Sequence, residues 1–208
     1  VLCDQGPMSI ESTLSVLYQM AQGLAYSHAQ GIVHGDIKPG NIMLKRTGAS
    51  KIIDIGSAFP VNTPPPQRTC TPAYAAPEVL MGEFATPLSD LASLGYVLIE
   101  LISGKNPFAG KRTYEDMVNA KKELPDRLEE TLPPKLGNKE FLVNFCRKLI
   151  AVDPKERFEN AAEAHINNQG AADYHRQLVM DHTSENIEYE HEIGLWLEEV
   201  MEGDEQAA

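Results

Sequence analysis

The sequence predicts a mainly α-helical fold that carries one short β-hairpin and ends in a helical, acidic tail. Three observations lead to this prediction: a helical apolar stripe near the N-terminus, two short apolar runs joined by a turn, and a long, almost wholly apolar helix after residue 88. At 208 residues, with 42% hydrophobic and 23% charged residues, the chain is long enough to bury a sizeable core.

The first predicted helix begins after Ser9, a favourable N-cap residue, and ends before Gly31. Buried positions are expected at helical spacing along it, which indicates a single stripe that faces the core. The stripe consists of Leu14, Leu17, Ala21, Leu24 and His28.

A β-hairpin is expected next, because the apolar runs Ile42-Met43-Leu44 and Lys51-Ile52-Ile53 flank a turn at Thr47-Gly48-Ala49-Ser50. Residues 57–76 then carry five prolines and should form a loop, since proline donates no backbone hydrogen bond to a ladder or a helix. The position of this loop between two polar motifs favours a functional role over a plain surface linker.

The longest apolar helix is expected over residues 89–103, with Ser89-Asp90 at its start and Gly104 after its end. It has little polar face, so it should be buried on nearly every side and form the centre of the core. Its apolar run is cut by Glu100 and is too short to span a bilayer, so no membrane segment is expected. Three shorter helices should follow, at about residues 113–122, 139–151 and 160–168.

Charge and cysteine content exclude several classes of function. The net charge is −12 and no Lys/Arg cluster offsets it, so a nucleic-acid-binding surface is not expected. Cys3, Cys70 and Cys146 are odd in number and form no C-x-x-C pair, which indicates reduced thiols, no structural zinc and a cytoplasmic location.

The excess of acidic residues lies mainly at the C-terminal end, where residues 166–208 hold eleven Asp/Glu against one Arg. Apolar residues recur there at helical spacing while most glutamates lie elsewhere, which predicts an amphipathic helix. Its stripe is Tyr189, Ile193, Trp196, Leu197 and Val200. We expect this helix to dock on the domain's own surface, and binding of a separate partner is the alternative.

Polar side chains gather in the stretch His34-Gly35-Asp36-Ile37-Lys38-Pro39-Gly40-Asn41. Its Pro-Gly pair excludes a continuous helix, so a loop should hold an acid, a lysine and an amide toward a common point. A further carboxylate, Asp54, directly follows the hairpin.

These motifs resemble the signature set of protein kinases. His34-Gly35-Asp36 with Asn41 five residues on is similar to the catalytic loop, Asp54-Ile55-Gly56 to the metal-binding triplet, and Ala76-Pro77-Glu78 to the Ala-Pro-Glu motif. The three occur in the family's order. The resemblance covers residues 1–168 and implies a protein-kinase-like C-terminal lobe of the bacterial (Hanks-type) Ser/Thr class, with residues 169–208 as a helical acidic tail.

The resemblance implies a role for each part of the loop in transferring the γ-phosphate of ATP to a protein substrate. Asp36 would accept or orient the proton of the substrate hydroxyl, and Lys38 would place a cation near the γ-phosphate. Thr71 matches a threonine that contacts the catalytic Asp and Lys. Together with Lys38 it favours Ser/Thr over Tyr substrates.

The nucleotide side of the site is implied in the same way. Asn41 and Asp54 would supply oxygen ligands to Mg²⁺, a hard ion suited to carboxylate, amide and phosphate oxygens. Met43 would form part of the floor under the adenine ring. Glu78 and Arg157 match a buried ion pair of the family, whereas His34 is expected to pack beneath the loop and not to act in catalysis.

The sequence also departs from the family pattern. Gly35 replaces an arginine that pairs with an activation-loop phosphate in many kinases, so we expect activity without loop phosphorylation. Ile55 replaces a phenylalanine and should take its packing role. The Gly-rich loop, the strand lysine and the partnering glutamate of the N-terminal lobe are expected upstream of Val1, so the chain alone should transfer no phosphate at a useful rate.

Two other functions remain open at this point. A pseudokinase or scaffold could use the same fold for binding, although retention of Asp36, Lys38, Asn41 and Asp54 argues against it. An interaction module acting through the acidic tail is the other possibility. Phosphotransfer by the completed protein tests the first, and deletion of residues 170–208 tests the second.

Overall fold

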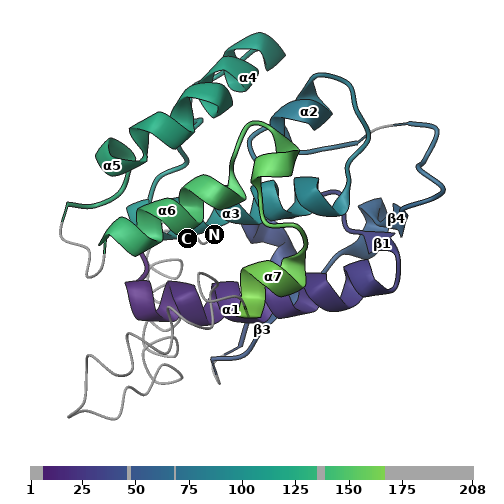
Figure 1. Ribbon diagram of the computed structural model, residues 1–208, viewed down its shortest axis with the longest axis horizontal. Coiled ribbons are helices and arrows are strands. Elements are labelled where there is room, and N and C mark those ends of the chain that lie inside the picture. The colour runs from purple at the N-terminus through teal and green to yellow at the C-terminus, as the bar shows by residue number, and fades with distance from the viewer. Residues whose placement is uncertain (1–6, 46–47, 68, 135–138, 167–208) are drawn as a thin grey trace, which may run out of the picture.

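The computed structural model describes residues 7–45, 48–67, 69–134 and 139–166. Helices dominate this part of the chain and are accompanied by two small antiparallel sheets of two strands each. Helix α3 (Pro87–Ser103) runs through the centre, while α1 (Ile10–Ala29) and α7 (Ala161–Ile166) lie side by side along one flank (Figure 1). The prediction of a mainly α-helical fold with a hairpin is confirmed.

Helix α1 forms where its local signals predict. The Ser9 hydroxyl accepts a hydrogen bond from the Ser12 backbone N–H at 3.2 Å, which caps the first turn. Gly31, at a φ of 71°, follows the helix end in the left-handed conformation that glycine adopts most readily. The predicted stripe of Leu14, Leu17, Ala21 and Leu24 is buried, as is the side chain of His28.

Helix α3 begins two residues earlier than the expected start at Ser89. Thr86 is the N-cap, Pro87 occupies the first helical position, and Ser89 closes a capping box by accepting from the Thr86 N–H at 3.1 Å. Proline at the first helical position fixes φ near the helical value, which explains the earlier start. Residues 89–102 are all buried, so the prediction of a helix buried on nearly every side is confirmed.

Close backbone approach joins α3 to α6 (Lys139–Leu149). A Cβ atom placed on Gly95 would lie 2.6 Å from Ile150 Cγ2 and 2.9 Å from Leu149 Cβ. Glycine therefore permits a helix separation that any larger residue would increase.

The expected hairpin is present as β2 (Ile42–Leu44) and β3 (Ser50–Ile52), with Met43 opposite Lys51. Gln19 of α1 fixes its turn: the side chain donates to the Gly48 carbonyl at 3.1 Å and accepts from the Ser50 N–H at 2.8 Å. Helix α1 and the hairpin are thus joined directly by hydrogen bonds.

A second sheet corrects the expectation that residues 57–76 are entirely loop. Strand β4 (Phe59–Pro60) pairs with β1 (Ile32–Val33), although Pro60 has no N–H to donate. The strand can accept a proline because the ladder is only two residues long, and the next N–H, that of Val61, donates to the Gly31 carbonyl at 2.8 Å. Such a pairing between segments distant in sequence leaves no local signal.

The remaining helices surround α3, and three of them, α4 (Tyr114–Glu123), α6 and α7, lie at the three expected positions. The remaining helices are α2 (Pro77–Leu80), α4, α5 (Leu128–Thr131), α6 and α7, with 3₁₀ turns at η1 (Pro39–Asn41), η2 (Ile55–Ser57), η3 (Leu124–Arg127) and η4 (Pro154–Glu156). Short α2 and α5 were not expected. Helix α7 covers the described part of the segment expected at residues 160–168.

Three sequence predictions concern other parts of the chain. Cys3 and the whole amphipathic stripe of the acidic tail lie outside the described residues, as does the boundary drawn between residues 168 and 169. Within the described ranges, none of the helices combines the length and the apolar character that crossing a bilayer requires.

Candidate active site

The buried carboxylate of Asp90 on α3 fixes the start of the polar loop. Its Oδ2 accepts from the His34 backbone N–H and its Oδ1 from the Gly35 N–H, both at 2.9 Å. Nε2 of His28 lies 2.9 Å from the same Oδ2. Sequence reasoning placed His28 in the apolar stripe of α1 and missed this contact; the signal was a polar residue at the end of an otherwise apolar row.

His34 packs beneath the loop, as expected for a residue without a catalytic role. It is buried, and its Nδ1 accepts from the Asp36 N–H at 3.3 Å. Its Nε2 lies 3.4 Å from the Ile53 carbonyl, to which it can donate in the tautomer that these two contacts require together. The imidazole thereby connects the loop to the end of the hairpin.

The carboxylate of Asp36 lies at the centre of the site and is held by Lys38 and Thr71. Lys38 Nζ donates to Asp36 Oδ2 at 2.6 Å and to Thr71 Oγ1 at 3.1 Å. The Thr71 hydroxyl and backbone N–H donate to Asp36 Oδ1 at 2.7 and 3.2 Å. The structure therefore brings together three predicted residues that are up to 35 positions apart.

These contacts set the charge state of Asp36. Burial alone raises the pKa of its carboxyl, but hydrogen bonds from Lys38 and Thr71 and the Lys38 charge outweigh burial, so the pKa is lowered overall. Asp36 is consequently held as a carboxylate with oriented lone pairs. Such a group can accept a hydrogen bond from a substrate hydroxyl.

Asn41 lies at the end of the 3₁₀ turn η1 and is buried. Its Nδ2 donates to the Asp36 carbonyl at 2.8 Å and lies 3.4 Å from Asp36 Oδ2. The Asn41 carbonyl accepts from the Ile53 N–H at 2.8 Å. Asn41 is thus fixed between the loop and the residue that precedes Asp54.

Asp54 has an unusual backbone conformation. At a φ of 60° it is the only non-glycine residue of the described ranges with positive φ, and its Oδ1 accepts from the Gly56 N–H at 3.1 Å. Its side chain is exposed. Strain of about 1–3 kcal/mol at such a position is typical of functional sites.

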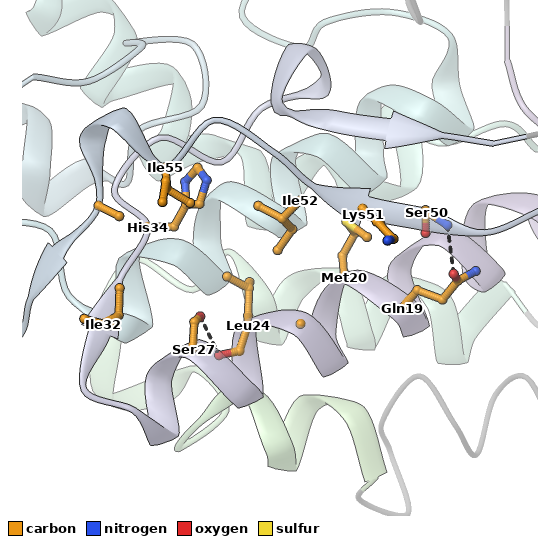
Figure 2. Close-up of a pocket in the computed structure, with 12 residues that line it drawn as sticks. Gln19, Met20, Leu24, Ser27, Ile32, His34, Ser50, Lys51, Ile52 and Ile55 are labelled. Carbon is orange, nitrogen blue, oxygen red and sulfur yellow. Dashed lines mark hydrogen bonds between the residues drawn. The ribbon is translucent and has the colours of Figure 1, made fainter.

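Met43, expected under the adenine ring, and Ile55, expected to take a packing role, both lie on the surface of this chain. Met43 is 46% exposed on β2, so it is not part of the core of this chain. Ile55 is 77% exposed, which differs from the packing role expected for it. Ile55 borders a mostly apolar cavity of about 360 Å³ between α1, β3 and η2, and Figure 2 shows it beside His34 at one end of that cavity.

The expected ion pair between Glu78 and Arg157 is confirmed. Two parallel hydrogen bonds join the guanidinium to the carboxylate, at 2.7 and 2.8 Å, and Ser89 donates to Glu78 Oε1 at 2.9 Å. Arg157 also donates to the carbonyls of Ala151 and Leu88, both at 2.9 Å. Burial raises the pKa of Glu78, but the Arg157 hydrogen bonds and charge lower it overall.

Comparison with known proteins shows the family to which the chain belongs. Residues 1–169 match the protein kinase domain family. The serine/threonine-protein kinase PknA of Mycobacterium tuberculosis is 42% identical over 138 residues, which cover 64% of this chain and 32% of that protein.

Two further relatives extend the match along the chain. The protein drp72 of Corynebacterium efficiens, named among the serine/threonine-protein kinases, is 34% identical over 76% of this chain and 30% of its own length. PknB of Mycobacterium tuberculosis is 32% identical over 76% of this chain and 26% of its own. The chain thus spans about a third or less of these relatives. It belongs to the protein kinase domain family, within the bacterial Hanks-type Ser/Thr group.

Proposed function

We propose that this chain is the C-terminal lobe of a Ser/Thr protein kinase that transfers the γ-phosphate of ATP to hydroxyl groups of protein substrates. The observation that carries the proposal is the Asp36 carboxylate, held at both oxygens by Lys38 and Thr71. An isolated surface aspartate would need no such support. A carboxylate fixed in this way is suited to orient one hydroxyl and to accept its proton.

The chain's own residues then divide the chemistry between them. Asp36 accepts the proton of the Ser or Thr hydroxyl while the hydroxyl oxygen bonds to the γ-phosphorus and the bond to ADP breaks. Lys38, which bridges Asp36 and Thr71, supplies a positive charge beside the transferred group. Thr71 holds the Asp36 carboxylate and the Lys38 ammonium in a fixed arrangement through hydrogen bonds to both.

Mg²⁺ and ATP are proposed as cofactors, and the donor set fits them. Asn41 uses its amide nitrogen on Asp36, which leaves the amide oxygen to face a cation, and the Asp54 carboxylate is exposed. In the ranges that the structure describes, no three or more His, Cys, Asp or Glu side chains are placed to hold a metal ion by themselves, so phosphate and water oxygens would complete the coordination. When bound, the metal–nucleotide complex supplies the phosphoryl group and neutralises its charge.

An N-terminal lobe, supplied by a longer protein, is proposed to cover the hairpin side of the chain. Exposed Met43 would then lie under the adenine ring, and exposed Ile55 would be buried beside the cavity of Figure 2. The apolar lining of that cavity, including Leu24, Ile32 and Ile52, supports a protein neighbour there.

Residues 169–208 would form a separate acidic tail. A reducing cytoplasmic setting suits the thiols of Cys70 and Cys146, which form no disulfide within the described ranges.

Phosphotransfer by the full-length natural protein tests the proposal. The assay compares wild type, Asp36→Ala and, as a matched control, Asp126→Ala at an exposed position outside the site. Loss of transfer by at least about a hundredfold in Asp36→Ala only, with ATP binding retained, is expected. ATP binding without any transfer by the wild-type protein would favour the pseudokinase or scaffold instead.

A further inference from the structure

Lys121, on α4, is a fully buried cation with no role in the site described so far. Its relative exposure is 0%, whereas the adjacent Lys122 is exposed. Lysine is almost never fully buried without a partner, because the ammonium loses its hydration. The groups around Lys121 must therefore replace the hydration that its ammonium loses.

The ammonium of Lys121 has three partners. Nζ donates to the Ala73 carbonyl at 2.7 Å and lies 3.8 Å from the ring centroids of both Tyr96 and Phe108. Aromatic faces attract a desolvated cation, and a carbonyl oxygen accepts from it strongly. No carboxylate of the described residues forms an ion pair with it.

This arrangement is costly compared with an apolar alternative. Burial lowers the pKa of Lys121 well below its usual range, and an electrostatic interaction with Cys70 only partly opposes this. A methionine of similar length would fill the same space between two aromatic rings without desolvating a charge. What methionine could not do is hold the Ala73 carbonyl.

Ala73 belongs to the turn that begins at Thr71. Both the Tyr74 and the Ala75 N–H groups donate to the Thr71 carbonyl, at 2.9 and 3.0 Å, while Thr71 itself donates to Asp36. The turn is therefore attached at its first residue to Asp36 and at its third to Lys121. Through the turn, α4 is joined to the residue proposed to receive the substrate hydroxyl.

We propose that Lys121 is a positioning residue that fixes residues 71–75 against Asp36 and so sets how the protein substrate is received. The inference rests on the proposed kinase function for its kinetic consequence, but its structural part stands independently. The nucleotide side, at Asn41 and Asp54, makes no contact with Lys121. The effect should therefore fall on the acceptor protein and not on ATP.

The experiment combines hydrogen exchange and steady-state kinetics on the full-length natural protein, with β-casein as acceptor. Lys121→Met removes the ammonium, and Lys122→Met is the matched control on the same helix. Tyr96→Phe is a second control, because it removes a buried hydroxyl that has no partner among the described residues and keeps the aromatic face. Phe108→Leu removes one face and retains the ammonium, in case Lys121→Met does not fold.

In Lys121→Met we expect amide exchange at residues 73–75 to quicken by about tenfold and the KM for casein to rise by about tenfold, the factor for one lost charge-assisted hydrogen bond. The KM for ATP should change by less than about twofold. Phe108→Leu should shift the same quantities in the same direction by a smaller factor, and both controls should match wild type.

Unchanged exchange in a folded Lys121→Met protein would overturn the inference. Faster exchange with an unchanged casein KM would also overturn it, since Lys121 would then be merely structural. If the wild-type protein transfers no phosphate, the proposed kinase function fails, and the exchange result alone decides whether Lys121 positions the turn.

Discussion

Asp90 accepts a 2.9 Å hydrogen bond from the backbone N–H of Gly35, a residue whose φ of 78° lies in the left-handed region. A Cβ atom on Gly35 would also lie 3.2 Å from the Ser57 carbonyl oxygen. The residue that departs from the family's arginine is therefore the one that adopts this conformation with the least strain.

Gly35→Ala should lower the free energy of unfolding by about 1–3 kcal/mol, because a side chain at positive φ is strained and the Ser57 carbonyl would have to move. Urea denaturation of this chain measures the change. Gly40→Ala is the control, since a Cβ there meets nothing within 4 Å. Equal midpoints for the two variants would show that the loop relaxes freely around residue 35.

Arg157→Ala should lower the free energy of unfolding by about 3–5 kcal/mol, because Glu78 would keep its buried charge without a partner. Arg127→Ala is the matched control: it removes an arginine from a pair with Glu130 whose side chains are 64% and 73% exposed, and should cost less than about 1 kcal/mol. Chemical denaturation measures both. A similar small loss for the two variants would contradict the importance assigned to the buried pair.

Lys38→Met should raise the pKa of the Asp36 carboxyl, because burial then acts with less opposition from hydrogen bonds and charge. In the wild-type protein the lowered pKa adds stability that is present above the ordinary value of 3.8 and is lost as the pH falls through the folded-state pKa. In the variant this contribution to stability should be smaller, and its loss should be complete at a higher pH than in the wild-type protein. Carboxyl ¹³C NMR titration measures the shift, and the exposed Lys45→Met should leave it unchanged.

Gly95→Ala should lower the free energy of unfolding by about 1–3 kcal/mol, since the added methyl would force α3 away from Ile150 and Leu149. Gly23→Ala on α1 is a control in which the free energy of unfolding should rise. Its Cβ would meet Ile52 Cδ1 at an ordinary 3.6 Å, and alanine favours a helix by about 0.5–1 kcal/mol. A thermal midpoint that rises in both variants would exclude the close helix packing.

The sequence predicted those parts of the fold that local signals control. The cap at Ser9 and the stripe through Leu24 identified α1, because both depend only on residues within a few turns. The pairing of Phe59–Pro60 with β1 was missed because it joins distant segments and includes a proline. The start of α3 was misplaced because Ser89 can serve either as an N-cap or as the third residue of a capping box.

At the site, the motif spacing identified Asp36 and Thr71, but only folding shows that they touch. Ile55 was expected to be packed because the family pattern describes a two-lobed molecule, whereas this chain leaves it exposed. The burial of Lys121 was not predicted, because two adjacent lysines are typical of an exposed helix face. Its spacing of four from Met117, a buried residue of the same helix, was the signal available.

The Glu78–Arg157 pair joins residues 79 positions apart, so it closes a loop that includes α3 and all of α4, α5 and α6. On a ribosome, the carboxylate would emerge long before its guanidinium partner and would remain hydrated until nearly the whole domain had been synthesised. Chains released before residue 157 would lack the guanidinium that binds the Glu78 carboxylate and the Leu88 carbonyl. We therefore expect proteases to cleave such truncated chains between Thr71 and Glu78 faster than they cleave the 208-residue chain.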